Sequence, residues 1–377
     1  MIQHSYKIRI MNRLRRVVVK VGSSNLSSPF GINRESIANI ARHLSTLHAS
    51  GKEVVLVSSG AVAAGMSRLG LPGRPKTIPA KQAAAAVGQI ALMALYEEDF
   101  SIHGVRVAQI LLTHDDLASR KRYLNAKHTM RALLDAGVIP IVNENDTVAV
   151  EEIQLGDNDN LSAQVAVLIE ADLLVILSDV AGLYDQDPRI HSEATLRSLV
   201  TRFDAELLAS GGAAGPLGRG GMASKLQSAH KTALCGIPTI ITDGRNEDSL
   251  VQVFDPQVDT GTLFLPVADR IASRKHWIAY TLKPAGALLV DAGACMAVRE
   301  QGRSLLPPGV REVRGVFEEG ECVTCIDNEG KEFARGLVNY NSQALTRIKG
   351  ARTGQIEQIL GYKVSDEVIH RDDLALL

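Results

Sequence analysis

The chain has 377 residues, of which 45% are hydrophobic and 22% charged, and its formal net charge at pH 7 is −1. This composition is typical of a soluble globular protein with a substantial core, and the length favours two domains over one. The near-neutral charge excludes a global attraction to nucleic acid or to an anionic membrane. The sequence contains no uninterrupted run of about 18 apolar residues, so we do not predict a transmembrane helix.

The first 16 residues are basic and contain no acidic side chain. They lack the apolar central stretch of a secretory signal, so we do not expect a signal peptide. We predict a short, disordered basic extension over residues 1–14, with a transit peptide as the alternative. The basic positions are Lys7, Arg9, Arg13, Arg15 and Arg16.

Strand-like and helix-like segments alternate over the first 265 residues. Apolar, β-rich runs occupy residues 15–22, 52–60, 105–113, 138–146, 172–180 and 237–244. Ala-rich or amphipathic stretches predict helices near 34–49, 80–99, 121–136, 160–170, 222–235 and 247–254. This alternation predicts an α/β fold, a three-layer α/β/α sandwich with a mainly parallel sheet covered on both faces.

Small and polar residues follow five of the predicted strands. In open α/β sheets, ligands bind beyond the carboxyl ends of the strands, so these segments are candidates for a site. Each alone is an ordinary turn, but together they predict a site rich in backbone amides and short polar side chains. The segments are Gly22–Asn25, Ser58–Ala61, Asn143–Asp146, Ser178–Asp179 and Asp243–Gly244.

Two lysines are placed where a phosphate group would bind. Lys20 lies inside an apolar strand, where a lysine is costly unless an anion pairs with it; an edge position with an outward ammonium group is the alternative. Lys225 lies about one turn into the helix that follows a glycine-rich segment, and the amino end of a helix favours negative charge. A flexible surface loop is the alternative for that segment, in which Gly218, Gly220 and Gly221 would let the backbone approach a phosphate closely.

Phosphoryl transfer is the chemistry that these features favour. The protein's part in such a reaction is to align donor and acceptor and to neutralise charge on the moving group. The sequence contains neither a P-loop motif nor a Rossmann glycine fingerprint. Residues 157–160, with two Asp and two Asn side chains before an Ala-rich run, are either a helix N-cap or part of a substrate site.

The composition changes near residue 265. We place a linker at 266–279, between a first domain at 15–265 and a second domain at 280–377. Short strands separated by Gly turns predict that the second domain is a small β-barrel or β-rich module, followed by a segment that is helical in pieces.

The four cysteines are scattered, and two of them form a C-x-x-C pair at Cys322 and Cys325. The pair lies in a predicted strand, where positions three apart point to opposite faces, so we do not expect it to bind a metal. Four scattered thiols are typical of a reducing cytosol, and we predict a cytoplasmic location.

Seven motifs follow one another between about residues 15 and 265. They are VVVKVGSS, VVLVSSGAVAAG, AAVGQ, PIVNENDTVAV, GDNDNLSAQVA, ILSDVAGLYDQDPR and GRGGMASKLQSA. In this order they resemble the glutamate 5-kinases, a group within the amino acid kinase family. The C-terminal part is similar to the PUA domain that many bacterial members append, so the resemblance covers nearly the whole chain.

The resemblance implies ATP-dependent phosphorylation of the side-chain carboxylate of L-glutamate to L-glutamyl 5-phosphate, the first step of proline biosynthesis. Lys20 and Lys225 would stabilise the charge on the transferring phosphoryl group. Asp159 would hold both lysines without acting as a base, because a carboxylate nucleophile is already ionised at neutral pH. Glutamate would be bound by Asp146 through its α-ammonium group, and through its carboxylates by Ser59 and Asn158.

The resemblance also implies a nucleotide site, with Mg²⁺ held mostly by phosphate oxygens and few or no direct protein ligands. Feedback inhibition by L-proline and assembly into a dimer or tetramer are further implications. The ATP-binding residues would be Lys20, Gly22, Ser178, Asp179, Gly218, Gly220, Gly221, Met222 and Lys225.

Two alternatives remain open at this point. Another amino acid kinase, acting on acetylglutamate, aspartate, carbamate or UMP, would share the nucleotide half; Asp146 argues for an acceptor with a free α-ammonium group. An RNA-binding PUA protein is the alternative from a different class. Residues 280–377 contain 12 Lys and Arg against 14 Asp and Glu, so this part carries about −2 and lacks the basic surface that RNA binding requires.

Overall fold

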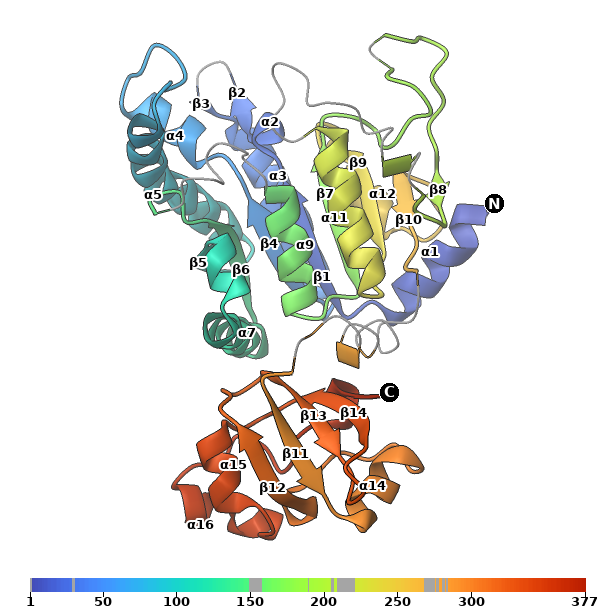
Figure 1. The fold of residues 1–377 in the computed structure, drawn as a ribbon. Helices are drawn as coiled ribbons and strands as arrows, with labels where there is room; N and C mark the ends of the chain where they lie inside the picture. Colours follow the sequence, from blue (N-terminus) through green and yellow to red (C-terminus); the bar gives the residue numbers. More distant parts are fainter. Residues whose placement is uncertain are drawn as a thin grey trace. The chain divides into compact units, whose positions relative to one another are not determined.

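The computed structural model describes residues 2–28, 31–148, 158–188, 190–204, 207–208, 221–267, 275, 278–279, 282 and 284–377. The chain divides into two compact units, drawn in Figure 1. The first is built from residues 1–118 and 125–267, and the second from residues 119–124 and 268–377.

The first unit is organised around an eight-stranded sheet with the order β5-β6-β4-β1-β7-β9-β10-β8. All paired strands in this sheet are parallel except β9 and β10, so the predicted mainly parallel sheet is confirmed. A short antiparallel pair, β2 (Ser27–Ser28) and β3 (Gly31–Ile32), lies outside it. The sheet strands are β1 (Arg16–Val21), β4 (Glu53–Ser58), β5 (Arg106–Leu112), β6 (Val138–Glu144), β7 (Leu173–Ser178), β8 (Leu199–Val200), β9 (Thr239–Asp243) and β10 (Thr262–Phe264).

Helices cover both faces of this sheet, which gives the predicted three layers (Figure 1). One face packs into an apolar cluster with α3 (Arg34–Ala49), α5 (Ile78–Ile102) and α12 (Ser249–Phe254). The other face contacts α9 (Asn158–Leu168) and α11 (Met222–Leu234), which lie side by side. The remaining helices of this part of the chain are α2 (Ser23–Leu26), α4 (Ala61–Arg68), α6 (His114–Ala118) and α7 (Arg120–Asp135).

The N-terminal residues form helix α1 (Ile2–Arg13), so the predicted disordered extension is wrong. Tyr6, Ile10 and Met11 pack against the apolar cluster of the sheet, and their i, i+4 and i+5 spacing places them on one face of the helix. Lys7 is fully buried, and its ammonium group donates to backbone carbonyls near the end of α12. The charge of the segment concealed this apolar face in the sequence.

Replacing Lys7 by methionine should destabilise the first unit. Lys7 Nζ donates to the carbonyl oxygens of Gln252, at 2.6 Å, and Val258, and both would lose a buried donor. Such a loss costs about 1–3 kcal/mol, which a urea titration would measure as a lower free energy of unfolding. Arg9→Met is the control, since Arg9 is exposed on the same helix and its loss should change little. Equal stabilities of the two variants would contradict the assigned role of Lys7.

Helix α5 is the one helix in the described part of the chain that is long and apolar enough to cross a membrane by length and composition. Its structural role in the fold is different. Gly88 on α5 and Gly65 on α4 lie at the crossing of the two helices, where a Cβ on either would come within 2 Å of the other helix's backbone. Leu92, Tyr96 and Phe100 are buried in the core cluster, so α5 is part of the packing that supports the sheet.

The second unit has a five-stranded mixed sheet with the order β12-β11-β13-β14-β15. The prediction of a β-rich module with terminal helical pieces is confirmed. Helix α14 was not expected; Asp291 starts it by accepting a hydrogen bond from the amide of Ala294 at 2.8 Å. The elements are β11 (Gly286–Val290), α14 (Ala292–Arg299), β12 (Val310–Gly315), β13 (Cys322–Ile326), β14 (Glu332–Leu337), α15 (Ser342–Ile348), α16 (Ile356–Leu360), β15 (Leu374–Leu376) and short 3₁₀ turns at Pro307–Gly309, Thr353–Gln355 and Arg371–Asp373.

The two faces of this second sheet belong to different apolar clusters. Cys325 lies in the main core of the unit, whereas Cys322 packs against Ile278 and Ala279 on the other face. The prediction that the C-x-x-C pair points to opposite faces is therefore confirmed. Burial raises the pKa of the Cys325 thiol to about 12 and also raises the pKa of Cys322, so both thiols are protonated at neutral pH.

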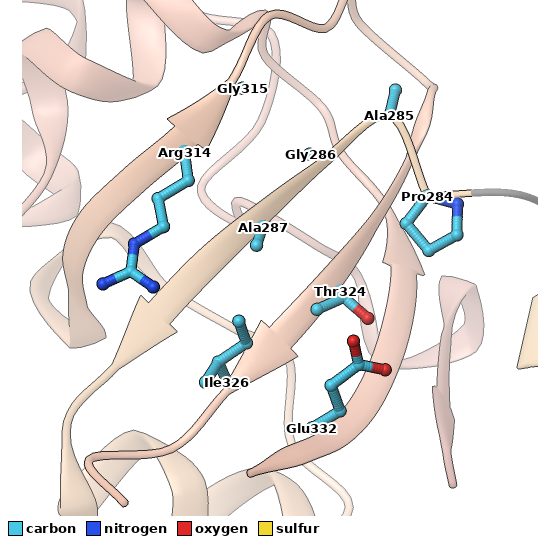
Figure 2. A pocket seen from close by; sticks show the side chains of 9 residues that line it. All are labelled: Pro284, Ala285, Gly286, Ala287, Arg314, Gly315, Thr324, Ile326 and Glu332. Carbon is cyan, nitrogen blue, oxygen red and sulfur yellow. The ribbon is translucent and has the colours of Figure 1, made fainter. Parts of the chain in front are cut away.

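A shallow cavity of about 310 Å³ lies on the second unit, over β11 and its neighbours (Figure 2). Its lining is mostly backbone and small side chains, and the charged groups at its rim belong to Arg314 and Glu332. The hydroxyl of Thr324 in this lining is buried and has no hydrogen-bond partner among the residues described.

Candidate active site

The strand order brings the predicted polar segments together at one edge of the first sheet. β6, β4, β1, β7 and β9 are consecutive neighbours in the sheet and run parallel. Their carboxyl ends therefore lie in a row. The residues that follow them are the ones the sequence analysis selected, which places the candidate site at this edge.

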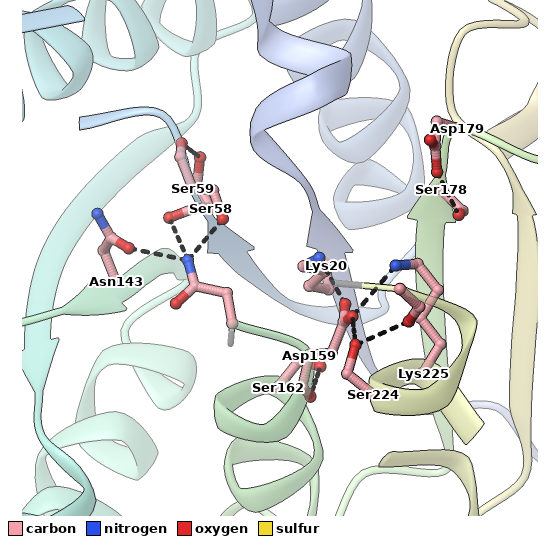
Figure 3. Close-up of polar contacts among 12 residues, drawn as sticks. Lys20, Ser58, Ser59, Asn143, Asp159, Ser162, Ser178, Asp179, Ser224 and Lys225 are labelled. Atoms are coloured by element: carbon pink, nitrogen blue, oxygen red, sulfur yellow. Dashed lines mark hydrogen bonds and ion pairs between the residues drawn. The ribbon is translucent and has the colours of Figure 1, made fainter. Parts of the chain in front are cut away.

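Three charged side chains meet at the centre of this edge (Figure 3). Lys20 Nζ lies 2.5 Å from Asp159 Oδ1, and Lys225 Nζ lies 3.2 Å from Asp159 Oδ2. Ser224 Oγ donates to the same Oδ2 at 2.7 Å. All three charged residues are at most 6% exposed. The two lysines, far apart in sequence, thus converge on one carboxylate.

The local structure explains this convergence. Side chains alternate along β1, and Val17, Val19 and Val21 point into the apolar cluster on one face. Lys20 therefore points to the opposite face, which α9 and α11 cover. Asp159 is in the first turn of α9 and Lys225 in the first turn of α11, so both helices present their amino ends to the tip of β1.

The two ammonium groups control the ionisation of Asp159. Burial alone would raise the pKa of this carboxyl, but the charges of Lys20 and Lys225 and the hydrogen bonds from Lys20 and Ser224 outweigh it. The pKa is lowered to about 2, so Asp159 is ionised and only weakly basic at neutral pH. The three side chains together carry a net charge of +1, which suits a site for an anion.

This lowered pKa predicts how stability responds to acid. A carboxyl with a pKa of about 2 in the fold and 3.8 in the unfolded chain stabilises the fold above about pH 3.8, and the stabilisation is lost as the pH falls through about 2. The contribution is roughly 2 kcal/mol. In urea titrations from pH 6 to pH 2, the stability difference between the natural chain and Asp159→Asn should shrink over this interval. A constant difference would contradict the ion-pair assignment.

A second group of polar side chains lies at the tips of β4 and β6 (Figure 3). The Asn158 amide nitrogen donates to Ser59 Oγ at 2.8 Å, Asn143 Oδ1 at 3.0 Å and the carbonyl oxygen of Ser58 at 3.2 Å. Asn158 Oδ1 is buried and has no hydrogen-bond partner among the described residues. The predicted contact of Asn158 with a substrate carboxylate stays a prediction. Asp146 lies in the turn after β6 and is half-buried.

The predicted nucleotide residues lie on the other side of the cluster. A Cβ on Gly22 would lie 3.4 Å from Lys20 Nζ, so the backbone here passes close to the ammonium group. Ser178 is buried at the end of β7, and its hydroxyl donates to Asp179 Oδ1 at 3.2 Å. Gly221 and Met222 begin α11. Gly218 and Gly220 lie outside the described residues.

Three polar residues near this edge are not among the site residues predicted from the sequence. Asn25 is buried beside the ends of β7 and β9, and neither atom of its amide has a partner among the described residues. Gln89 is buried on α5 and accepts a hydrogen bond from Asn143 Nδ2 at 2.8 Å. Ser224 contacts Asp159 directly. Asn25 belonged to a predicted polar segment, but nothing in the Ala-rich run around Gln89 distinguishes it from an ordinary helix residue.

Comparison with known proteins agrees with this arrangement. Residues 15–243 match the sequence profile of the amino acid kinase family, and residues 286–360 match that of the PUA domain. The glutamate 5-kinase of Geobacter sulfurreducens is 50% identical over 98% of this chain and 99% of its own length. The glutamate 5-kinase of Thermus thermophilus is 52% identical over 96% of this chain and 97% of its own length.

These matches cover both units and nearly the full length of the relatives. The matched profile spans every strand from β1 to β9, and therefore all residues of the candidate site. The chain belongs to the amino acid kinase family, in the group of the glutamate 5-kinases, and carries a C-terminal PUA domain.

Proposed function

We propose that this chain transfers the γ-phosphoryl group of ATP to the side-chain carboxylate of L-glutamate, giving L-glutamyl 5-phosphate for proline biosynthesis. The observation that carries the proposal is the pairing of Lys20 and Lys225 with Asp159 at the carboxyl edge of the sheet. It occurs in a chain whose relatives at about 50% identity are glutamate 5-kinases. Transfer to a carboxylate needs cations around the moving group, and this site supplies two.

The lysines and Asp159 have different roles in this proposal. Lys20 and Lys225 stabilise the negative charge on the oxygens of the transferring phosphoryl group. Asp159 holds the two ammonium groups close together, because each of them contacts one oxygen of its carboxylate. It is not a general base, because its pKa of about 2 makes it a poor proton acceptor and the glutamate carboxylate is already ionised.

The nucleotide is bound beside β1 and β7 in this proposal. Backbone amides near Gly22 and Gly221 approach the phosphates, with Ser178, Asp179 and Met222 at the border of the site. Gly218 and Gly220 are assigned here through the resemblance of their segment to the family motif. Because Asp159 is engaged with two ammonium groups, Mg²⁺ would be held by phosphate oxygens and water, where it neutralises charge on the nucleotide.

The acceptor is bound beside β4 and β6. Ser59 and Asn158 lie within one hydrogen bond of each other, and Asp146 follows the same row of strand ends. Asp146 supplies a carboxylate that pairs with the α-ammonium group of glutamate. This pairing distinguishes glutamate from acceptors without an α-ammonium group, such as acetylglutamate or carbamate.

Replacing Asp146 by alanine should raise KM for glutamate by roughly 10- to 100-fold and leave KM for ATP within about twofold, because only the acceptor loses an ionic contact. Initial rates at varied glutamate and ATP concentrations give both constants. Asp135→Ala is the control, since Asp135 is an exposed carboxylate at the end of α7. A rise in KM for ATP alone would mean that the two pockets are assigned in reverse.

The proposed function is tested by ADP release with glutamate as the sole acceptor. We expect turnover with glutamate and none above background with acetylglutamate, aspartate or carbamate. Glutamate-independent ADP release, or turnover with another of these acceptors instead, would overturn the proposal. Adding L-proline to the same assay tests the expected feedback inhibition, and sedimentation tests assembly into a dimer or tetramer. A cytoplasmic location is part of the proposal, because ATP is an intracellular substrate.

A further inference from the structure

A row of four side chains crosses the face of the second sheet that is turned away from the main core of this unit. The strand register pairs Ala287 of β11 with Arg314 of β12 and with Thr324 of β13. It also pairs Thr324 with Arg335 of β14. Residues paired across neighbouring strands share a face, and Cys325, next to Thr324, points into the main core. The row therefore lies on the opposite face, where Ala287 leaves a hollow between larger neighbours (Figure 2).

Two buried polar groups in this row have no hydrogen-bond partner among the residues described. They are the hydroxyl of Thr324, a residue that is 3% exposed, and the Nε–H group of Arg335. The hydroxyl can donate or accept, whereas the guanidinium group only donates. An oxygen atom between the two would accept from both. The pair therefore favours a ligand that brings a carbonyl or carboxylate oxygen.

The two arginines of the row differ in how their carboxylate neighbours engage them. Arg314 donates twice to Glu312, from Nε at 3.0 Å and from Nη2 at 2.9 Å. Arg335 donates from Nη1 to the carbonyl oxygen of Ala279 at 2.8 Å. Its Nη2, however, lies 3.7 Å from Glu332 Oε2, which is too long for a hydrogen bond. The Nε and Nη2 side of Arg335 is thus the kind of fork that binds a carboxylate with two hydrogen bonds.

Glu332 adds an acceptor to the same cavity. Its side chain is 51% exposed, and in Figure 2 its carboxylate is directed toward the Thr324 hydroxyl. Exposed side chains change rotamer within nanoseconds, so Glu332 can turn outward and admit a ligand to Thr324 and Arg335. Arg335 and Glu332 together carry no net charge. This balance suits a ligand that carries one charge of each sign.

The floor of the cavity is small and apolar. A Cβ on Gly286 would lie 2.5 Å from the ring of Phe317, which belongs to the main core, so Gly286 faces that core. Side chains alternate along a strand, so Ala285 and Ala287 face the cavity. Ile326 completes the apolar part of the lining. A volume of about 310 Å³ over these side chains suits a compact ligand with a short apolar group.

We propose that this cavity binds a small neutral amino acid in its zwitterionic form. The carboxylate of the ligand accepts hydrogen bonds from the Thr324 hydroxyl and from the Arg335 fork. Its α-ammonium group donates to Glu332, and its apolar side chain contacts Ala287 and Ile326. No residue of the candidate active site takes part, so the inference goes beyond the proposed function and does not depend on it.

Methyl NMR of the full chain tests this binding site. Ala β and Ile δ1 methyl groups are labelled, so that Ala287 and Ile326 report on the cavity. The probe is L-valine, and its matched controls are isovalerate, which lacks the ammonium group, and isobutylamine, which lacks the carboxylate. We expect L-valine to shift both signals saturably with a Kd of roughly 1 mM. The two controls should bind at least about 10-fold more weakly, because each loses one ionic contact.

Two variants assign the contacts. Thr324→Val removes the hydroxyl at nearly constant shape, and Glu332→Gln removes the charge of the carboxylate. Each should weaken L-valine binding about 10-fold. Glu329→Gln, an exposed position in the turn before β14, is the control and should bind as the natural chain does. Unchanged signals from the other labelled methyl groups show that each variant is folded.

Four results would overturn the proposal. Isovalerate binding as tightly as L-valine would mean that the fork holds any simple carboxylate. Tighter binding of L-valine by Glu332→Gln would mean that Glu332 only blocks the cavity. Undiminished binding in both variants, or no saturable shift with L-valine even where a short RNA shifts the same signals, would also overturn it. None of these measurements uses phosphoryl transfer, so a failure here is distinguishable from a failure of the proposed function.

Discussion

Replacing Lys225 by alanine is expected to lower kcat by roughly 10²–10⁴-fold and to change KM for ATP by less than about tenfold. Lys225 is buried against Asp159 at the tip of β1, where its charge meets the phosphoryl group as negative charge spreads over the transferring oxygens. The contact strengthens in the transition state, so the loss falls mainly on turnover. Initial-rate kinetics with varied ATP at saturating glutamate separate the two constants.

A second lysine on the same helix provides the control for this variant. Lys231 is exposed on α11, and its ammonium group bonds to Asn160 Oδ1 rather than to the Asp159 cluster. Lys231→Ala should retain turnover within about twofold. Undiminished turnover in Lys225→Ala would remove Lys225 from the mechanism, and an equal loss in both variants would mean that the helix, not the charge, was disturbed.

Replacing Asp159 by asparagine is expected to destabilise the nucleotide-free protein by about 3–5 kcal/mol. The carboxylate is 1% exposed and forms ion pairs with both Lys20 and Lys225, so the neutral amide leaves two buried ammonium groups close together. Turnover should fall as well, because the lysines lose the group that sets their separation. Urea titration at pH 7 measures the first effect and ADP release the second.

Charge balance provides a sharper test of the same cluster. The natural trio carries a net charge of +1, Asp159→Asn raises it to +2, and adding Lys225→Met returns it to +1. The double variant should therefore recover part of the stability that Asp159→Asn loses, while remaining inactive. Asp135→Asn, on the surface, should change stability by less than about 0.5 kcal/mol. A double variant less stable than both single variants would contradict the ionic account.

The residues of the candidate site differ in how clearly the sequence alone indicates that they have a role there. Lys20 is conspicuous, because a lysine in an otherwise apolar strand requires a partner. Gln89 is not, because it lies in a long helix whose other buried positions are mostly apolar or small. Its hydrogen-bond partner is Asn143, which comes from a strand 54 positions later. No local pattern records such a pairing.

The N-terminal helix shows where local reasoning failed. Residues 1–14 are basic and contain no acidic residue, and the three apolar side chains of Tyr6, Ile10 and Met11 are too few to predict a docked helix. What makes the helix stable is the surface it covers, which is the apolar cluster of the sheet and the carbonyl groups near the end of α12. That surface exists only once the sheet has formed.

The sequence by itself determined the alternation of strands and helices, the presence of Lys20 within an apolar strand, and the polar ends of the strands. These follow from periodicity and from the chemistry of single residues, both of which are local. The tertiary structure alone decided that Lys20 and Lys225 share the carboxylate of Asp159 and that the side chains of Gln89, Asn143 and Asn158 are joined by hydrogen bonds. Those contacts depend on strand order and helix packing, which arise from the summed burial of many apolar side chains rather than from any one segment.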